Sequence, residues 1–139
     1  MVFALVVLGA PARAEPLIQA RLAPDDLKWE RTPTGGLRAN LVGDDKKSGM
    51  YMYRVQFPAN AKVQPHFHPD ERIITVLSGT LYMGYGEKFD EKTMKALPAG
   101  SAWTEPAKQT HLVWAKDGEA VIQIIGANGP SGVTQIDPK

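Results

Sequence analysis

Residues 65–79 read Pro-His-Phe-His-Pro-Asp-Glu-Arg-Ile-Ile-Thr-Val-Leu-Ser-Gly. They contain two of the three histidines in the chain, His66 and His68, with one residue between them. Side chains alternate between the faces of a β-strand, so positions i and i+2 point the same way, with Cα atoms roughly 6.5–7 Å apart at a rise of about 3.3 Å per residue. Two imidazoles at that separation can bind one metal ion at about 2.0–2.1 Å. The stretch therefore predicts a metal site beside the apolar strand that follows.

The remainder of the chain is a series of short apolar runs separated by Gly, Pro, Asp and Asn, a pattern typical of all-β proteins. We expect strands at residues 37–42, 50–57, 72–77, 80–85, 101–105, 109–116 and 119–125, with weaker candidates at 27–31 and 133–136. Nine or ten short strands with close turns predict a sandwich or a barrel. Residues 87–97 have helical composition, and we expect at most two turns of helix there.

Length and composition indicate one ordinary globular domain. The chain has 139 residues, of which 43% are hydrophobic and 22% charged. Like charges form no blocks, so the sequence gives no indication of nucleic-acid binding. Cysteine is absent, which excludes disulfides and thiolate chemistry. The sequence also contains no nucleophile motif, phosphate loop or nucleotide fingerprint.

The N-terminus resembles a signal peptide. Residues 1–9 are almost wholly apolar, and Ala12-Arg13-Ala14 has the small-x-small form of a cleavage site. Cleavage after Ala14 would give a mature domain of residues 15–139, located in the periplasm or secreted. The apolar run is shorter than the roughly 20 residues that span a bilayer, so we expect no membrane attachment of the mature form. Because no Lys or Arg precedes the run, a buried N-terminal strand is the alternative.

The third histidine, His111, ends a second motif that begins at Gly100. Together the two motifs resemble those of the cupins, a family of double-stranded β-helix, or jelly-roll, barrels. The first cupin motif is Gly, five residues, His-x-His, three or four residues, Glu, six residues, Gly. The second is Gly, five residues, Pro-x-Gly, two residues, His, three residues, Asn. The residues that match are His66, His68 and Gly79 in the first motif, and Gly100, Pro106 and His111 in the second.

This resemblance covers about residues 50–126 and implies a single jelly-roll barrel with a metal site. The chain is also similar to a narrower group of small exported cupins, through His68-Pro69 and residues 75–80 and 86–90. Three departures fall at loop or edge positions, where Asn60 and Lys108 replace glycines and Ala115 replaces the final Asn. A fourth departure concerns the metal site, because Arg72 stands at the position of the glutamate and Glu71 comes one residue early.

Three alternatives follow from this offset, since a shift of one residue reverses the direction of a strand side chain. In the first, the backbone through Pro69 and Asp70 is irregular and Glu71 still reaches the metal, with Asp70 as a lesser candidate. In the second, the three histidines hold the metal alone and leave positions for water or substrate. In the third, Arg72 points inward, opposes metal binding, and pairs with Asp70 or Glu71 or binds an anion.

We therefore expect a mononuclear site with neutral His66, His68 and His111 as ligands and Glu71 as the fourth. Such ligands suit one divalent transition metal ion, Fe, Mn, Ni or Zn. The resemblance implies a metal-dependent enzyme that acts on a small molecule, of oxygenase, isomerase or lyase type. The alternative is a non-catalytic cupin that binds a small anion or sugar, and a third hypothesis is an interaction protein that forms a homodimer. An inward Arg72 would favour anion binding and count against redox catalysis, whereas an outward Arg72 would leave the enzyme hypothesis standing.

Overall fold

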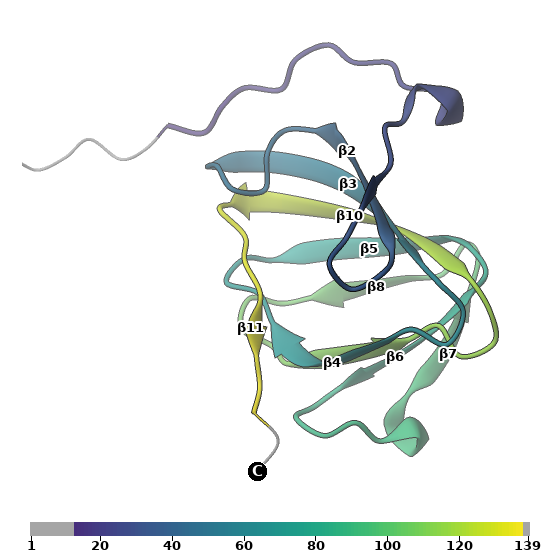
Figure 1. The fold of residues 1–139 in the computed structure, drawn as a ribbon. Helices are drawn as coiled ribbons and strands as arrows, with labels where there is room; N and C mark the ends of the chain where they lie inside the picture. The colour runs from purple at the N-terminus through teal and green to yellow at the C-terminus, as the bar shows by residue number, and fades with distance from the viewer. Residues whose placement is uncertain (1–12, 138–139) are drawn as a thin grey trace, which may run out of the picture.

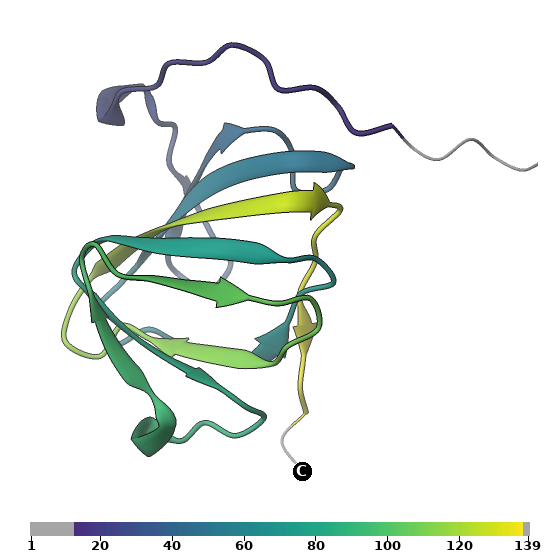
Figure 2. The same cartoon turned by 180° about the vertical axis from the view of Figure 1, so that it is seen from behind.

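Two antiparallel β-sheets make up the domain in the computed structural model, which describes residues 13–137. The six-stranded sheet has the order β1-β2-β3-β10-β5-β8, and the five-stranded sheet has the order β11-β4-β9-β6-β7. The strands of the larger sheet are β1 (Glu30–Arg31), β2 (Leu37–Val42), β3 (Gly49–Phe57), β5 (Arg72–Ser78), β8 (Ala102–Glu105) and β10 (Ala120–Gly129). Those of the smaller sheet are β4 (Lys62–Phe67), β6 (Thr80–Tyr85), β7 (Lys95–Pro98), β9 (His111–Trp114) and β11 (Thr134–Gln135). The sheets face each other as a jelly-roll barrel (Figures 1 and 2).

The core lies between the two sheets and follows from the alternation along their strands. In β3, Tyr51 and Tyr53 are buried, whereas Met52 between them is partly exposed. In β5, Ile74 and Val76 are buried and Ile73 is 56% exposed. Strands β3 and β5 therefore each contribute one apolar face to the interior, as expected where two sheets pack together.

Tight turns close the barrel where the sequence has the matching residues. Gly79 joins β5 to β6 with a φ of 72°, and a Cβ there would lie 2.2 Å from the carbonyl oxygen of Glu119. Asn60 and Lys108, which stand where cupins have glycine, also adopt positive φ values of 65° and 62°. The backbone conformation that favours glycine is therefore present at both positions without glycine.

The expected elements differ from the observed ones at several places. Residues 87–97 form a short 3₁₀ turn, η2 (Glu91–Thr93), followed by the unexpected strand β7. The strand expected at 109–116 begins only at His111, because residues 106–110 form a turn in which the Gln109 amide donates to the Pro106 carbonyl. Of the strand expected at 27–31, the structure has β1, and the 3₁₀ turn η1 (Pro24–Asp26) precedes it. No helix in residues 13–137 has the length and apolar character needed to cross a membrane.

The predicted signal segment, residues 1–14, falls almost entirely outside the described residues. At the opposite end, residues 130–137 leave β10 and run along the side of the barrel (Figure 1). There β11 pairs with β4, placing Thr134 opposite Phe67 and Gln135 opposite His66. This C-terminal segment therefore adds a strand to the edge of the smaller sheet, next to the first histidine.

Candidate metal site

Three buried histidines converge inside one end of the barrel. His66 lies near the end of β4, His68 just after it, and His111 at the start of β9. His66 and His111 are direct partners across the β4–β9 pairing. The exposed fractions of the three side chains are at most 6%, and their candidate ligand atoms all lie within 4.8 Å of one another. The structure therefore brings together the three histidines that the sequence predicted as ligands.

Each imidazole is oriented by a hydrogen bond from its Nδ1 to a backbone carbonyl. His66 donates to Gln64 at 2.8 Å, His111 donates to Gln109 at 3.1 Å, and His68 donates to Gly132 on the C-terminal segment. Carbonyl oxygens accept and cannot donate, so Nδ1 carries a proton in each ring, and in the neutral ring Nε2 keeps its lone pair. The same outer hydrogen bond fixes the tautomer of histidine ligands in metal proteins.

The Nε2 atoms of His68 and His111 are buried and have no hydrogen-bond partner of acceptable geometry. Buried polar atoms are normally paired, so two unpaired lone pairs that face a common point need an explanation. A cation supplies one, because small side-chain rotations would bring the three nitrogens to about 2.0–2.1 Å from a single ion. The residues present therefore fit a metal ion.

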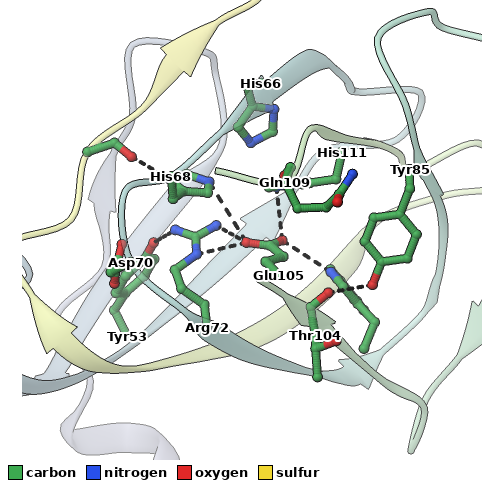
Figure 3. A network of polar contacts seen from close by, with 12 residues as sticks. Tyr53, His66, His68, Asp70, Arg72, Tyr85, Thr104, Glu105, Gln109 and His111 are labelled. Carbon is green, nitrogen blue, oxygen red and sulfur yellow. Dashed lines mark hydrogen bonds and ion pairs between the residues drawn. The ribbon is translucent and has the colours of Figure 1, made fainter. Parts of the chain in front are cut away.

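A buried carboxylate lies beside the histidines, and it belongs to Glu105. Glu105 is 3% exposed, with Oε1 3.1 Å from His111 Nε2 and Oε2 3.8 Å from His68 Nε2 (Figure 3). Two ligand atoms about 2.1 Å from one metal lie roughly 3.0–3.4 Å apart, so the shorter distance resembles that between neighbouring ligands. Glu105 is thus next to the cluster. Among the described residues, however, the ligand atoms that all lie within 4.8 Å of one another belong to the three histidines.

Arg72 also points into the barrel, where Glu105 binds it. The two residues are register partners on β5 and β8. Arg72 Nε donates to Glu105 Oε2 at 2.8 Å, Nη2 donates to the same oxygen, and Nη1 donates to the Tyr53 hydroxyl at 3.0 Å. Trp103 Nε1 donates to the other carboxylate oxygen at 3.1 Å. The cation at the family's glutamate position is therefore neutralised by a carboxylate from the neighbouring strand.

The protonation states in the cluster suit metal binding. Burial lowers the pKa of His66 and of His68 to about 4. The next contribution is the charge of His111 for His66 and the charge of Arg72 for His68. Both imidazoles are therefore neutral at pH 7. Burial alone would raise the pKa of Glu105. The contact with His111 and the charge of Arg72 outweigh burial and lower the pKa to about 2. Neutral imidazoles and an ionised carboxylate are the forms that bind metal ions.

The two carboxylates proposed from the sequence lie elsewhere. Glu71 is exposed, on the opposite face of the chain from Arg72, and is outside the histidine group. The structure does not bring Glu71, the expected fourth ligand, to the histidines, because β5 is regular from Arg72 onward and the one-residue offset turns Glu71 outward. Asp70 is buried, but it accepts a hydrogen bond from the Tyr51 hydroxyl and is also outside the group.

The structure therefore combines parts of two alternatives. The three histidines form a cluster without Glu71, as the second alternative expected. Arg72 points inward as in the third, but its partner is Glu105 and neither Asp70 nor Glu71.

Sequence reasoning missed Glu105, although a signal was present. A buried arginine needs a carboxylate, and Glu105 directly precedes Pro106 of the second motif, at the end of a predicted strand. Its importance depends on which strand lies beside β5, and the order of the strands does not follow from the second motif alone.

Comparison with known proteins identifies a matching protein family. The family model described as the ChrR cupin-like domain matches residues 19–124. No curated protein matches the chain.

Solved structures show the same fold at low sequence identity. An RmlC-like cupin from Shewanella frigidimarina is 14% identical, with a TM-score of 0.67 over 81% of this chain and 94% of its own. The polyketide cyclase RemF from Streptomyces resistomycificus is 16% identical, with a TM-score of 0.70 over 88% of each chain. An oxalate oxidase is 22% identical, with a TM-score of 0.58 over 76% of this chain and 57% of its own.

Proposed function

We propose that this chain, which belongs to the ChrR cupin-like domain family, is a metal-dependent enzyme acting on a small molecule. The observation that carries the proposal is the convergence of one ring nitrogen from each of the three histidines, whose Nδ1 atoms are held by backbone carbonyls. Two structural neighbours are named as enzymes with small-molecule substrates, a polyketide cyclase and an oxalate oxidase, which supports the general class.

His66, His68 and His111 would hold one divalent transition metal ion, Fe, Mn, Ni or Zn. When bound, such an ion acts as a Lewis acid or activates oxygen, which suits an oxygenase, isomerase or lyase. The three carbonyl acceptors keep the imidazoles oriented, and the surrounding barrel core excludes bulk water. Glu105 is placed to accept a proton, at Oε1, from a ligand held beside His111.

A non-catalytic cupin that binds a small anion or sugar is the second candidate, and the inward direction of Arg72 is the observation that favours it. The Glu105 carboxylate accepts from two nitrogens of the guanidinium, however, and the Tyr53 hydroxyl accepts from the third. A ligand anion would therefore have to displace a buried carboxylate that sits on the same cation. This competition favours the enzyme over the anion-binding protein.

Metal analysis tests the proposal. The domain from residue 15 onward is purified without added metal, loaded with one equivalent of Fe(II), Mn(II), Ni(II) or Zn(II), desalted and analysed for bound metal. We expect close to one ion per chain in the wild type and loss in His66→Ala and His111→Ala. Glu71→Ala is the matched control, because this exposed carboxylate should leave the metal content unchanged. A folded wild type that retains no ion after loading would overturn the proposal.

We also propose that the protein is exported to the periplasm or secreted after cleavage behind Ala14, as residues 1–14 suggest. N-terminal sequencing of the chain expressed from residue 1 in a Gram-negative host tests this, with Glu15 expected as the first residue in the periplasmic fraction. Full-length protein confined to the cytoplasm would contradict it.

A further inference from the structure

The histidine cluster opens onto an inner cavity of about 160 Å³. The histidines, Arg72 and Glu105 lie at one end, and the remaining walls are largely apolar and come from both sheets. The aliphatic and aromatic side chains among them include Val55, Phe57, Val63, Val113, Ile122 and Ile124. Any ligand that reaches the metal position therefore has a confined apolar space beside it.

A second hollow, of about 390 Å³, leads toward this cavity from the surface. The two hollows share Tyr53, Val55, Phe57 and Val63, so these side chains form a neck between them. The walls of the outer hollow also include polar side chains, from the turn between β1 and β2, from β4 and from β11. A ligand that comes from the surface would therefore enter the inner cavity through this neck.

The cations along this route are already engaged. Arg72 is bound to Glu105, and Arg38 pairs with Asp45 at 2.8 Å and stacks over the Tyr53 ring at 3.7 Å. Lys62 places its Nζ 4.2 Å from the centre of the Trp114 ring. No other lysine or arginine lines either hollow in the described part of the chain. Inside the inner cavity, where Arg72 is the one cation, a second carboxylate or a phosphate beyond the group on the metal would thus find no free partner.

We infer that the ligand of this site is a compact molecule in which an apolar group no larger than about benzene is joined to a single bidentate oxygen donor. The cavity volume sets this upper limit, since an apolar protein cavity of about 150 Å³ binds benzene and this one must also hold the donor at its histidine end. The single donor follows from the charges of the inner cavity, because the one cationic side chain that lines it, Arg72, is already paired with Glu105 and the metal would be the positive charge left for a ligand. This inference rests on the proposed metal site.

Hydroxamates of increasing size test it, because they share one bidentate oxygen donor. Affinities of acetohydroxamate, benzohydroxamate and 2-naphthohydroxamate are measured by calorimetry on the Zn(II)-loaded domain. We expect benzohydroxamate to bind roughly ten- to a hundredfold more tightly than acetohydroxamate, the range expected when the additional apolar surface of a phenyl ring leaves water. The naphthyl compound should gain nothing further, because its second ring exceeds the cavity.

Val55→Trp narrows the neck and the apolar space beside it, so it should weaken benzohydroxamate binding far more than acetohydroxamate binding and thereby remove the preference. Val121→Trp is the matched control, because Val121 lies on β10 with its side chain on the outer face of the same sheet. Melting temperatures and metal content of both variants establish that they are folded and loaded. Equal affinities for the two smaller hydroxamates, an unchanged preference in Val55→Trp, or a tighter naphthyl compound would each overturn the inference.

A metal-free arm separates this inference from the proposed function. Benzene is titrated into the chelator-treated domain, and the methyl resonances of the cavity valines and isoleucines are followed by NMR. If benzene binds but the domain fails to retain metal in the loading experiment, the proposed function is overturned, whereas the inferred pocket for an apolar group is supported. Failure of benzene to bind overturns the inference even if metal loads fully.

Discussion

Replacing Arg72 by methionine should destabilise the metal-free protein strongly, and metal should restore more stability to this variant than to the wild type. The Arg72 and Glu105 side chains are 7% and 4% exposed, with Nε and Oε2 2.8 Å apart. Removing one partner of such a pair leaves a buried charge without compensation, at a cost of about 3–5 kcal/mol. A typical domain has only about 5–15 kcal/mol of stability, so this is a large fraction.

The metal effect follows from the position of the carboxylate. In Arg72→Met, Glu105 has lost its cation but still lies 3.1 Å from His111 Nε2. A divalent ion on the histidines then replaces the guanidinium as its partner. We expect Zn(II) to bind at least tenfold more tightly than in the wild type, which adds about 1.4 kcal/mol or more to the stabilisation at saturation.

Urea unfolding followed by tryptophan fluorescence, with a chelator or with excess Zn(II), measures both effects. The double variant Arg72→Met with Glu105→Gln is the control, because it removes both charges. It should recover most of the loss in chelator and show no enhanced zinc effect. A cost below about 1 kcal/mol in Arg72→Met, or an equal zinc stabilisation in variant and wild type, would refute the proposed link between the ion pair and the metal site.

Three further predictions concern the surroundings of the site. Lys108→Gly should raise the free energy of unfolding by roughly 0.5–1 kcal/mol in chemical denaturation, because glycine removes the strain of a φ of 62°; a loss of stability would contradict this. In the presence of chelator, the free energy of unfolding should be greatest above pH 6.5 and fall toward pH 4 by up to roughly 3 kcal/mol per histidine, because the fold lowers the pKa of His66 and of His68 and protons bind the unfolded chain first. Replacing both histidines by glutamine should flatten this pH dependence in urea unfolding. Deleting residues 130–139 removes the Gly132 carbonyl that accepts from His68, so metal affinity in a chelator-competition titration should weaken roughly 10–100-fold, and an unchanged affinity would show that this acceptor is dispensable.

The fold could be predicted from the sequence because its signals are local. The alternation through β3 and the turn glycine at residue 79 each specify their structure within a few residues. The two motifs then place His66, His68 and His111 in one barrel. Strand β7 was missed because the charged residues before it resemble a short helix and only the pairing with β6 makes the segment extended.

The carboxylate could not be predicted, because its position depends on which strands are neighbours. The offset of Glu71 gave a correct warning that the family's glutamate was absent. Whether Arg72 would be tolerated inside the barrel depended on β8, which lies beside β5 and places Glu105 opposite Arg72. Local patterns describe the direction of one side chain, whereas this pair requires the register of two strands that are 33 residues apart.

The Arg72–Glu105 arrangement changes what a metal site of this kind can do. In the cupin pattern that the chain resembles, the glutamate stands where Arg72 is here and would itself face the metal. In this chain the carboxylate comes from β8, and the guanidinium holds its Oε2 atom while Oε1 faces His111. An oxygen held in this way would compete less for an ion on the histidines, and the ion would then keep more positive charge and more open positions. For the proposed metal site, the exchange therefore favours binding by the three histidines, with positions left for a bidentate ligand and Glu105 beside it as an ionised base.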